Sequence, residues 1–202
     1  MTQNYQKSNN IVLASSSPRR QEILSLFIPK LEIIPSQINE DILSDESPET
    51  YVLRLAKEKA EDIAKNCKDK FVIGADTTVV CEGNILAKPL DIEDAKRMLK
   101  QLSGNWHSVL TGVAVINTVA NKQAIDICQT QVKFNQLTDQ EIDWYIATGE
   151  PFDKAGAYAI QGYGSIFIEE IAGNYLNVVG LPITLVRKLL KTVDGDLIEF
   201  NK

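Results

Sequence analysis

The apolar positions in the first half of the chain alternate between continuous runs and helical stripes. The runs Ile11–Ala14 and Phe71–Ala75 are typical of buried strands, and Thr77–Cys81 can continue the second one. Leu31–Ile34 predicts a short strand between them. A helix is predicted from Ser17 to Pro29 and another from Ser47 to about Ala64. Each opens with a serine cap followed by proline and continues with apolar residues at helical spacing.

Paired strands replace this alternation in the second half. Trp106–Asn117 and Gln123–Phe134 predict a hairpin, and Ile166–Ile171 and Tyr175–Val179 predict short strands around a turn. Further helices are predicted to begin at three cap or proline positions, Asp91, Thr138 and Pro182. Helices alternating with strands and then paired strands predict an α/β fold with a mixed sheet.

Length and charge narrow the functional classes. The 202 residues suffice for one large domain or two small lobes that share a cleft. We expect a flexible extension over Met1–Asn9 and a single two-lobed domain over 10–202. The 21 Lys and Arg against 27 Asp and Glu give a net charge of −6, which argues against binding of DNA or RNA polymers. One small basic pocket for a single nucleotide remains compatible with this charge.

The number of cysteines and the length of the apolar runs are typical of a cytoplasmic protein. The chain has three cysteines, Cys67, Cys81 and Cys128, and no two of them have the short spacing typical of metal ligands. Neither a disulfide framework nor a structural zinc site is therefore expected. The segment Met1–Asn10 is polar, and no run approaches the roughly 18 apolar residues that span a bilayer. We expect a cytoplasmic protein without a membrane partner.

The segment Ser15–Arg20 links the first strand to the first helix and has two interpretations. Ser17 and Pro18 suit the helix start, but Arg19 and Arg20 put positive charge at the positive end of the helix dipole. Free N–H groups, serine hydroxyls and guanidinium groups together suit a phosphate. The residues alone leave a capped helix with solvated arginines and an anion site as equal alternatives.

Two familiar kinds of catalytic or nucleotide site are disfavoured. A serine hydrolase needs a base beside its nucleophile, and His107 is the single histidine, with no Gly-x-Ser-x-Gly. We therefore expect His107 to be structural. Neither a Gly-x-Gly-x-x-Gly motif after the first strand nor a Walker-type P-loop is present.

Acids and lysines at element ends supply another chemistry. Asp76 follows the apolar run Phe71–Ala75, and Glu40 lies in a polar loop. Lys59 lies off the apolar face of its helix, and Lys88 precedes a proline in an extended segment. Carboxylates can hold Mg²⁺ and activate water, and lysines neutralise phosphates, so the set suits phosphoanhydride hydrolysis. Taken singly, Lys59 and Lys88 are more typical of solvated surface, whereas a carboxylate that ends a buried strand needs a partner.

Several short motifs coincide in order with those of one family. They are Ala14–Arg20, Arg54–Ala56 with Glu58–Ala60, Gly74–Thr77, Lys88-Pro89, Ser103-Gly104 with His107, Glu150–Gly156, Gln161-Gly162 and Asn177–Pro182. Through them the chain resembles the Maf family of nucleoside triphosphate pyrophosphatases, from about Ile11 to Leu190. The resemblance implies an elongated mixed sheet flanked by helices, as in inosine triphosphate pyrophosphatases, with two lobes around a cleft and a homodimeric assembly.

The resemblance also implies hydrolysis of a nucleoside triphosphate to the monophosphate and pyrophosphate with Mg²⁺ or Mn²⁺. Asp76 matches the proton acceptor and a metal ligand, and Glu40 matches the loop acid expected to hold metal. Asn39 stands where members often have Asp, which leaves the local metal geometry open. The phosphate-binding positions of the family are matched by Ser15, Arg19, Lys59 and Lys88.

Three residues resemble the branch of the family that acts on dTTP and UTP rather than on 7-methyl-GTP. They are Arg20, Thr77 and Gln161, which we expect to read the pyrimidine. Modified pyrimidine nucleotides are a further expected substrate class. Two alternatives stay open: a nucleotide-binding regulator of septum formation, and the same enzyme with a preference for 7-methyl-GTP or CTP.

Overall fold

The computed structural model describes residues 10–201, so the predicted extension at Met1–Asn9 lies outside the described residues. Its centre is a seven-stranded mixed sheet in the order β2-β1-β3-β5-β6-β7, with β4 paired to β3 off this path. The pairs β2–β1 and β1–β3 are parallel, and the other pairs are antiparallel. The strands are β1 (Ile11–Leu13), β2 (Glu32–Ile33), β3 (Phe71–Cys81), β4 (Asn84–Leu86), β5 (Trp106–Asn117), β6 (Lys122–Phe134) and β7 (Ile168–Ala172).

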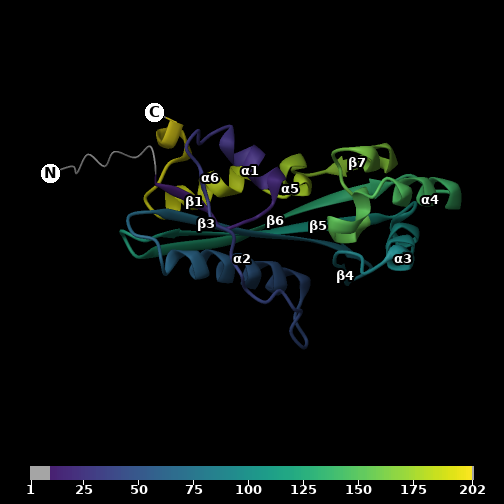
Figure 1. The fold of residues 1–202 in the computed structure, drawn as a ribbon, viewed down its shortest axis with the longest axis horizontal. Coiled ribbons are helices and arrows are strands. Elements are labelled where there is room, and N and C mark those ends of the chain that lie inside the picture. Colours follow the sequence, from purple (N-terminus) through teal and green to yellow (C-terminus); the bar gives the residue numbers. More distant parts are fainter. Residues whose placement is uncertain (1–9, 202) are drawn as a thin grey trace.

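Helices cover both faces of the sheet in the first lobe, which is the part built on β1, β2 and the adjoining halves of β3, β5 and β6. Helix α2 (Pro48–Ala64) lies on one face, and α1 (Pro18–Ser25), α5 (Tyr175–Val179) and α6 (Ile183–Thr192) lie on the other (Figure 1). Leu24, Ile73 and Leu189 belong to the core on the α6 side, and Val72 and Ala60 to the core under α2. Burial of these apolar faces is the main stabilising term for such a layered fold.

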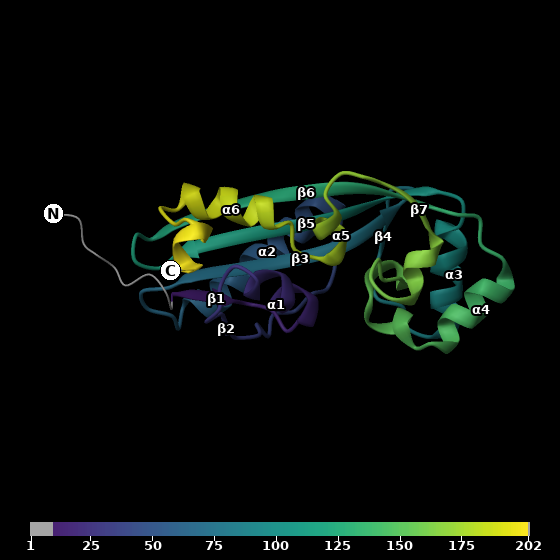
Figure 2. The same ribbon diagram turned by 90° about the horizontal axis from the view of Figure 1, so that it is seen from above.

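The second lobe packs around the far ends of the long strands β3, β5 and β6. It contains α3 (Ile92–Leu102), α4 (Asp139–Ala147) and short 3₁₀ turns at Glu150–Asp153, Ala155–Ala157 and Tyr163–Phe167, and its core is separate from those of the first lobe. A further 3₁₀ turn at Leu197–Asn201 follows α6. The two lobes share these strands, and the molecule is elongated (Figure 2). The predicted elongated, two-lobed mixed sheet is therefore confirmed.

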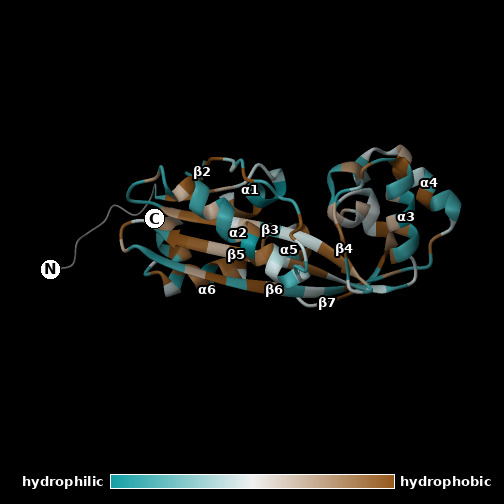
Figure 3. Cartoon of the chain, turned by 90° about the horizontal axis from the view of Figure 1, so that it is seen from below, coloured by the Kyte–Doolittle hydropathy of each residue, from teal (hydrophilic) through white to brown (hydrophobic). Residues whose placement is uncertain are grey.

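Glycine lets α2 lie directly on the sheet. A Cβ on Gly74 of β3 would come within 2.2 Å of the Ala56 carbonyl oxygen, and one on Gly112 of β5 within 2.2 Å of the Val52 carbonyl oxygen. Hydrophobic residues predominate along the central strands β3 and β5 (Figure 3). This close approach determines the distance between α2 and β3. It therefore also determines where Lys59 of α2 lies relative to β3.

Most predicted elements are confirmed, and three details are corrected. The buried run Phe71–Ala75 and its possible continuation Thr77–Cys81 form one strand, so Asp76 lies within β3 and not at its end. The strand predicted at Tyr175–Val179 is the helix α5, because Asn174 accepts a hydrogen bond from the N–H of Asn177 and Gly180 ends the turn. The strand predicted from Ile166 begins at Ile168, after the 3₁₀ turn. Within residues 10–201, none of the helices combines the length and apolarity that crossing a membrane requires.

Candidate active site

A gap in one edge of the sheet forms the candidate site. Along this edge, β1 pairs with β3 over Phe71–Ile73, and β4 pairs with it over Val79–Cys81. The stretch between these pairings borders a cavity of about 600 Å³, within the range of roughly 300 to 1,000 Å³ typical of ligand pockets. The cavity walls contain every site residue expected from the sequence: Ser15, Arg19, Arg20, Glu40, Lys59, Asp76, Thr77, Lys88 and Gln161.

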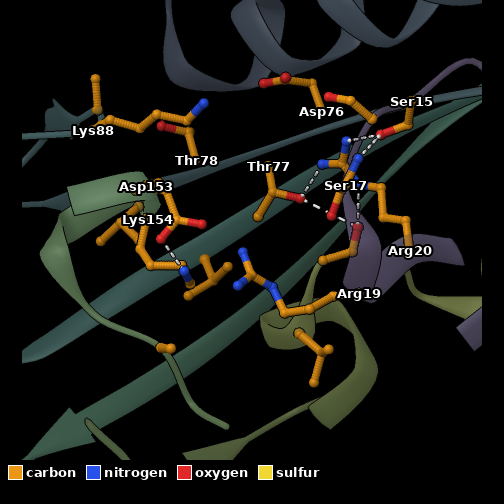
Figure 4. A pocket seen from close by; sticks show the side chains of 18 of the residues that line it. Ser15, Ser17, Arg19, Arg20, Asp76, Thr77, Thr78, Lys88, Asp153 and Lys154 are labelled. Atoms are coloured by element: carbon orange, nitrogen blue, oxygen red, sulfur yellow. Dashed lines mark hydrogen bonds and ion pairs between the residues drawn. The ribbon is translucent and has the colours of Figure 1, made fainter. Parts of the chain in front are cut away.

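The strand pleat sends neighbouring residues of β3 to opposite faces. Gly74 and Asp76 face α2, whereas Ala75 and Thr77 face α1 and α5. Because the edge of β3 is open here, side chains from both faces reach the same cavity. Figure 4 shows Asp76 and Thr77 diverging from the strand in this way.

On the α2 face, one lysine joins two carboxylates. The Nζ atom of Lys59 lies 2.7 Å from Oδ1 of Asp76 and 2.8 Å from Oε1 of Glu40. The side chains of Lys59 and Asp76 are 8% and 10% exposed, whereas that of Glu40 is 52% exposed. The expectation that Lys59 is typical of solvated surface is therefore wrong, since its partners come from β3 and a distant loop.

Burial sets the proton affinity of Asp76. Removal from water raises the pKa of Asp76 above its ordinary value, and the charges of Lys59 and Arg20 offset this effect only in part. A carboxylate with a raised pKa accepts a proton more readily from bound water. The site thus contains a candidate general base.

The loop that carries Glu40 is held by two residues of α2. The hydroxyl of Tyr51 donates to the Glu40 carbonyl over 3.0 Å, and the Arg54 guanidinium donates to the Asp41 carbonyl over 3.0 Å. Arg54 also donates to both carboxylate oxygens of Glu46 over 2.6 and 2.7 Å. Neither Tyr51 nor Arg54 was expected at the site from its residue type. Tyr51 lies at helical spacing from both Arg54 and Lys59, and Arg54 belongs to one of the motifs that led to the family, so these were the available signals.

On the opposite face, Arg20 is buried in a network of acceptors. Its guanidinium donates to the Gly180 carbonyl and the Ala75 carbonyl over 2.8 Å each, and to Oγ1 of Thr77 over 2.9 Å. A longer bond of 3.2 Å reaches Oγ of Ser15. Burial lowers the pKa of Arg20, so these bonds compensate for the lost hydration. Among residues 10–201, the second N–H on Nη2 of Arg20 has no acceptor, so it is available to a ligand.

Three further expected residues line the cavity with free polar ends. Within residues 10–201, the side chains of Arg19, Lys88 and Gln161 form neither a hydrogen bond nor an ion pair, and Lys88 and Gln161 are exposed. Ser17 takes the N-cap position of α1 without a side-chain cap bond, and its N–H donates to Oγ of Ser15 over 3.2 Å. The helix start therefore leaves a cationic surface toward the cavity, which favours the anion-site interpretation.

The second lobe adds Asp153 and Lys154, which sequence reasoning included in a motif but not among the site residues. Both line the cavity, and their side chains form an ion pair. The run Pro151–Gly156, with its proline and glycine around a charged pair, was the available signal.

His107 takes no part in a nucleophile pair. It is buried in the second lobe, where Nε2 lies 2.8 Å from the Tyr158 hydroxyl and the ring packs against Phe134. Burial lowers the pKa of His107 to about 4. The expected structural role of His107 agrees with these contacts.

The donors present suit a hard divalent cation shared with a ligand. Glu40 and Asp76 reach the same Lys59 ammonium, so their carboxylates lie close together. Among the described residues, no cluster of three or more His, Cys, Asp or Glu could hold a metal alone. Mg²⁺ in nucleotide sites is commonly bound by one or two carboxylates, with waters and substrate phosphates completing its shell. The residues therefore fit a cation that arrives with a polyphosphate.

Comparison with known proteins identifies the family of the chain. Residues 10–193 match the family described as Maf-like protein. The chain is 50% identical over 186 residues to the dTTP/UTP pyrophosphatase of Geotalea uraniireducens, covering 92% of this chain and 96% of the relative. It is also 50% identical over 182 residues to the dTTP/UTP pyrophosphatase of Clostridioides difficile, covering 90% and 94%.

Among solved structures, the Staphylococcus aureus Ham1 protein matches with a TM-score of 0.48 and 15% identity, over 79% of this chain and 80% of that one. The family match spans nearly all of the described residues, and the sequence relatives are covered almost completely. The chain belongs to the Maf-like protein family.

Proposed function

We propose that the protein is a nucleoside triphosphate pyrophosphatase that hydrolyses dTTP and UTP to the monophosphate and pyrophosphate. The observation that carries the proposal is the pair of carboxylates, Asp76 and Glu40, on one buried lysine in the wall of a cation-lined cavity. The names of the relatives at 50% identity support the choice of nucleotides.

The reaction begins with a water molecule beside Asp76. The Asp76 carboxylate takes a proton from this water, and the water oxygen attacks the α-phosphorus as the bond from this phosphorus to the bridging oxygen of the β-phosphate breaks. Pyrophosphate leaves with that oxygen, and the nucleoside monophosphate keeps the oxygen of water. Arg19, Lys59, Lys88 and the hydroxyl of Ser15 neutralise the charge that develops on the phosphates.

Glu40 and Asp76 would hold the Mg²⁺ or Mn²⁺ expected of this chemistry. A bound divalent cation polarises phosphate oxygens and neutralises part of their charge. The hydrogen bonds from Tyr51 and Arg54 to the loop keep Glu40 near Asp76. In this proposal α2 therefore serves both to neutralise phosphate through Lys59 and to orient the loop acid.

Arg20, Thr77 and Gln161 are proposed to read the base. Thymine and uracil present two carbonyl acceptors and one ring N–H donor. The remaining Arg20 N–H can donate to a carbonyl, and the Gln161 amide can both accept and donate. The bonds from Arg20 to Thr77 and Gly180 support a preorganised reader, since they fix the guanidinium before a ligand enters. Modified pyrimidines that keep these groups are proposed as further substrates.

We propose further that the protein acts in the cytoplasm as a homodimer, with no nucleic-acid polymer and no membrane as partner. The free thiols of Cys67, Cys81 and Cys128 support a reducing compartment. The homodimer rests on the resemblance to the family, and sedimentation of the purified protein tests it. A role in septum formation would require nucleotide binding without turnover, which the intact Asp76, Lys59 and Lys88 disfavour.

A substrate panel tests the proposal. Common and modified nucleoside triphosphates are incubated with the enzyme, with and without Mg²⁺ or Mn²⁺, while released pyrophosphate is measured. We expect metal-dependent release that is fastest for dTTP and UTP. Tight dTTP binding without pyrophosphate would favour the regulatory alternative, and faster release from 7-methyl-GTP or CTP would reassign the base.

A further inference from the structure

The second lobe presents a lysine to the cavity that the proposed function leaves unused. The Lys154 side chain is 12% exposed, and the Asp153 side chain beside it is 72% exposed. Lys154 lines the cavity, and Asp153 supplies its ion pair. A largely buried lysine whose counter-ion within residues 10–201 is one exposed carboxylate is positioned to exchange that partner for another anion.

The backbone around Lys154 is fixed by the neighbouring strands. The N–H of Gly156 donates to the Ala87 carbonyl over 3.1 Å, and the N–H of Ala157 donates to the Lys154 carbonyl over 3.1 Å. Gly156 has a φ of +69°, and a Cβ there would lie 3.0 Å from the Val79 side chain. These contacts join the loop to β3 and to the segment before Lys88. Lys154 therefore has a defined place relative to Lys88.

Charges from both lobes meet at Asp153. The ends of Lys154 and Arg19 point toward one another in the cavity, with Asp153 beside them (Figure 4). Burial would raise the pKa of Asp153, but the hydrogen bond from Lys154 and the charges of Lys154 and Arg19 bring it below its ordinary value. Asp153 is thus an ionised carboxylate facing one cation from each lobe, as a phosphate oxygen would.

We propose that Lys154 binds a phosphate group of the substrate and that Asp153 is the counter-ion it gives up when the nucleotide enters. This inference rests on the proposed function for the identity of the substrate, a nucleoside triphosphate. Substrate phosphates take over the interactions of Asp153 with Lys154 and Arg19, so the two lobes are bridged by the ligand. Asp153 keeps the lysine side chain oriented in the free enzyme and competes with the substrate for it.

The proposal predicts opposite effects for the two members of the pair. Loss of the Lys154 charge removes a charge-assisted hydrogen bond to phosphate and weakens nucleotide binding. Loss of the Asp153 charge removes the competitor and strengthens binding. A pair with a purely structural role would instead lower stability in both variants without changing affinity in opposite directions.

The test uses Lys154→Gln, Lys154→Arg and Asp153→Asn in the full chain. Lys96→Gln is the matched control, because Lys96 is a lysine of the same lobe that pairs with Asp143 outside the cavity. We expect Lys154→Gln to raise KM for dTTP about tenfold to a hundredfold, in line with a lost hydrogen bond between charged groups. Lys154→Arg should stay within about threefold of the parent, and Asp153→Asn should lower KM about twofold to threefold.

Calorimetric binding of inorganic triphosphate separates this inference from the proposed function. If the parent protein hydrolyses no nucleotide, weaker binding of this probe by Lys154→Gln than by Lys96→Gln still supports the phosphate site. Equal affinity of these two variants would overturn it, whatever the catalytic activity. Weaker binding by Asp153→Asn than by the parent would also overturn it, including the case in which Lys154→Gln does not fold.

Discussion

The two faces of β3 at the open edge of the sheet differ in how they use buried charge. Toward α2, Asp76 shares Lys59 with the exposed Glu40, so both signs of charge meet where water and phosphate can enter. Toward α1, Arg20 is surrounded by neutral acceptors on Ala75, Thr77 and Gly180. Because successive residues of a strand face opposite sides, β3 places the proposed proton transfer on one face and the proposed base recognition on the other.

The largest expected effect comes from Asp76→Asn. We expect kcat to fall by about a thousandfold or more for every nucleotide hydrolysed, because the general base is lost while the shape is kept. Pyrophosphate release measures turnover, and circular dichroism checks the fold. Asp126→Asn, which changes a surface carboxylate paired with Lys188, is the control. Turnover of Asp76→Asn within tenfold of the parent would refute the assigned base.

The packing of α2 on the sheet can be disrupted by a substitution that leaves every charged residue in place. Gly74→Val adds a side chain where the Ala56 carbonyl lies 2.2 Å from an ideal Cβ, so α2 must move away from β3. We expect the free energy of unfolding to fall by about 1–3 kcal/mol in denaturant titrations. Gly112→Ala should show the same direction of change, because its Cβ meets the Val52 carbonyl. Unchanged unfolding for both variants would show that the close approach is unimportant.

His107 of the second lobe provides a contrast with both faces of β3, because its buried ring contacts Tyr158 and Phe134, which carry no opposite charge. The folded pKa of His107 is about 4, below the ordinary value of 6.5, so the unfolded chain takes up the proton first as pH falls. Stability is therefore lost as pH falls from about 6.5 toward 4, by about 2 kcal/mol at pH 5. Unfolding of the parent and of His107→Gln across this window isolates the effect. Parallel pH profiles for the two proteins would contradict the expectation.

Glu40→Gln tests the exposed member of the group formed by Lys59, Asp76 and Glu40. We expect the Mg²⁺ concentration for half-maximal activity to rise about tenfold, because one carboxylate is lost from a site that offers two. Direct Mn²⁺ binding, followed by electron paramagnetic resonance in the presence of inorganic triphosphate, provides a readout independent of turnover. Glu49→Gln is a matched control from the start of α2 outside the cavity. Equal Mn²⁺ affinity for the two variants would remove Glu40 from the metal site.

The smallest expected effect concerns the α1 face. Thr77→Val removes the hydroxyl that accepts from Arg20 and contacts Thr111, so the guanidinium loses one of its anchors. We expect the ratio of kcat/KM for dTTP over CTP to fall about threefold to tenfold, with kcat for dTTP changed less than by any substitution of Asp76. Competition between the two nucleotides measures the ratio. An equal loss for both nucleotides would indicate that the two faces are not separate in function.

The local patterns were sufficient for most elements but not for the site. Helix caps and apolar spacing predicted α1, α2, α3 and the long hairpin, because these signals lie within a few residues. The apolar run alone put Asp76 at a strand end and left Thr77–Cys81 as a possible continuation, since the partners that satisfy the polar residues of β3 come from α1 and α2. The five-residue run Tyr175–Val179 was assigned wrongly because a short apolar run fits either a strand or a helix.

Lys59 and Lys154 illustrate the remaining gap. Periodicity on α2 correctly located the apolar stripe, but it could not reveal that Asp76 and Glu40 would bury a lysine beside that stripe. The motif around Lys154 was visible, yet its distance in sequence from Arg19 concealed that both line one cavity. Contacts between distant segments decide these positions, and a single sequence carries little direct signal for them.

Arg20 also bears on how the protein avoids association with other chains. An open stretch of strand with free carbonyl groups invites an extended segment of another molecule to add alongside it. Beyond the last bond from β1, in which Ala14 donates to the Ile73 carbonyl, the Arg20 guanidinium takes the next carbonyl on that edge, Ala75. The Arg20 side chain thus takes the place of a neighbouring strand at the point where β1 ends. Substitutions of Arg20 made to change nucleotide preference should therefore also increase aggregation.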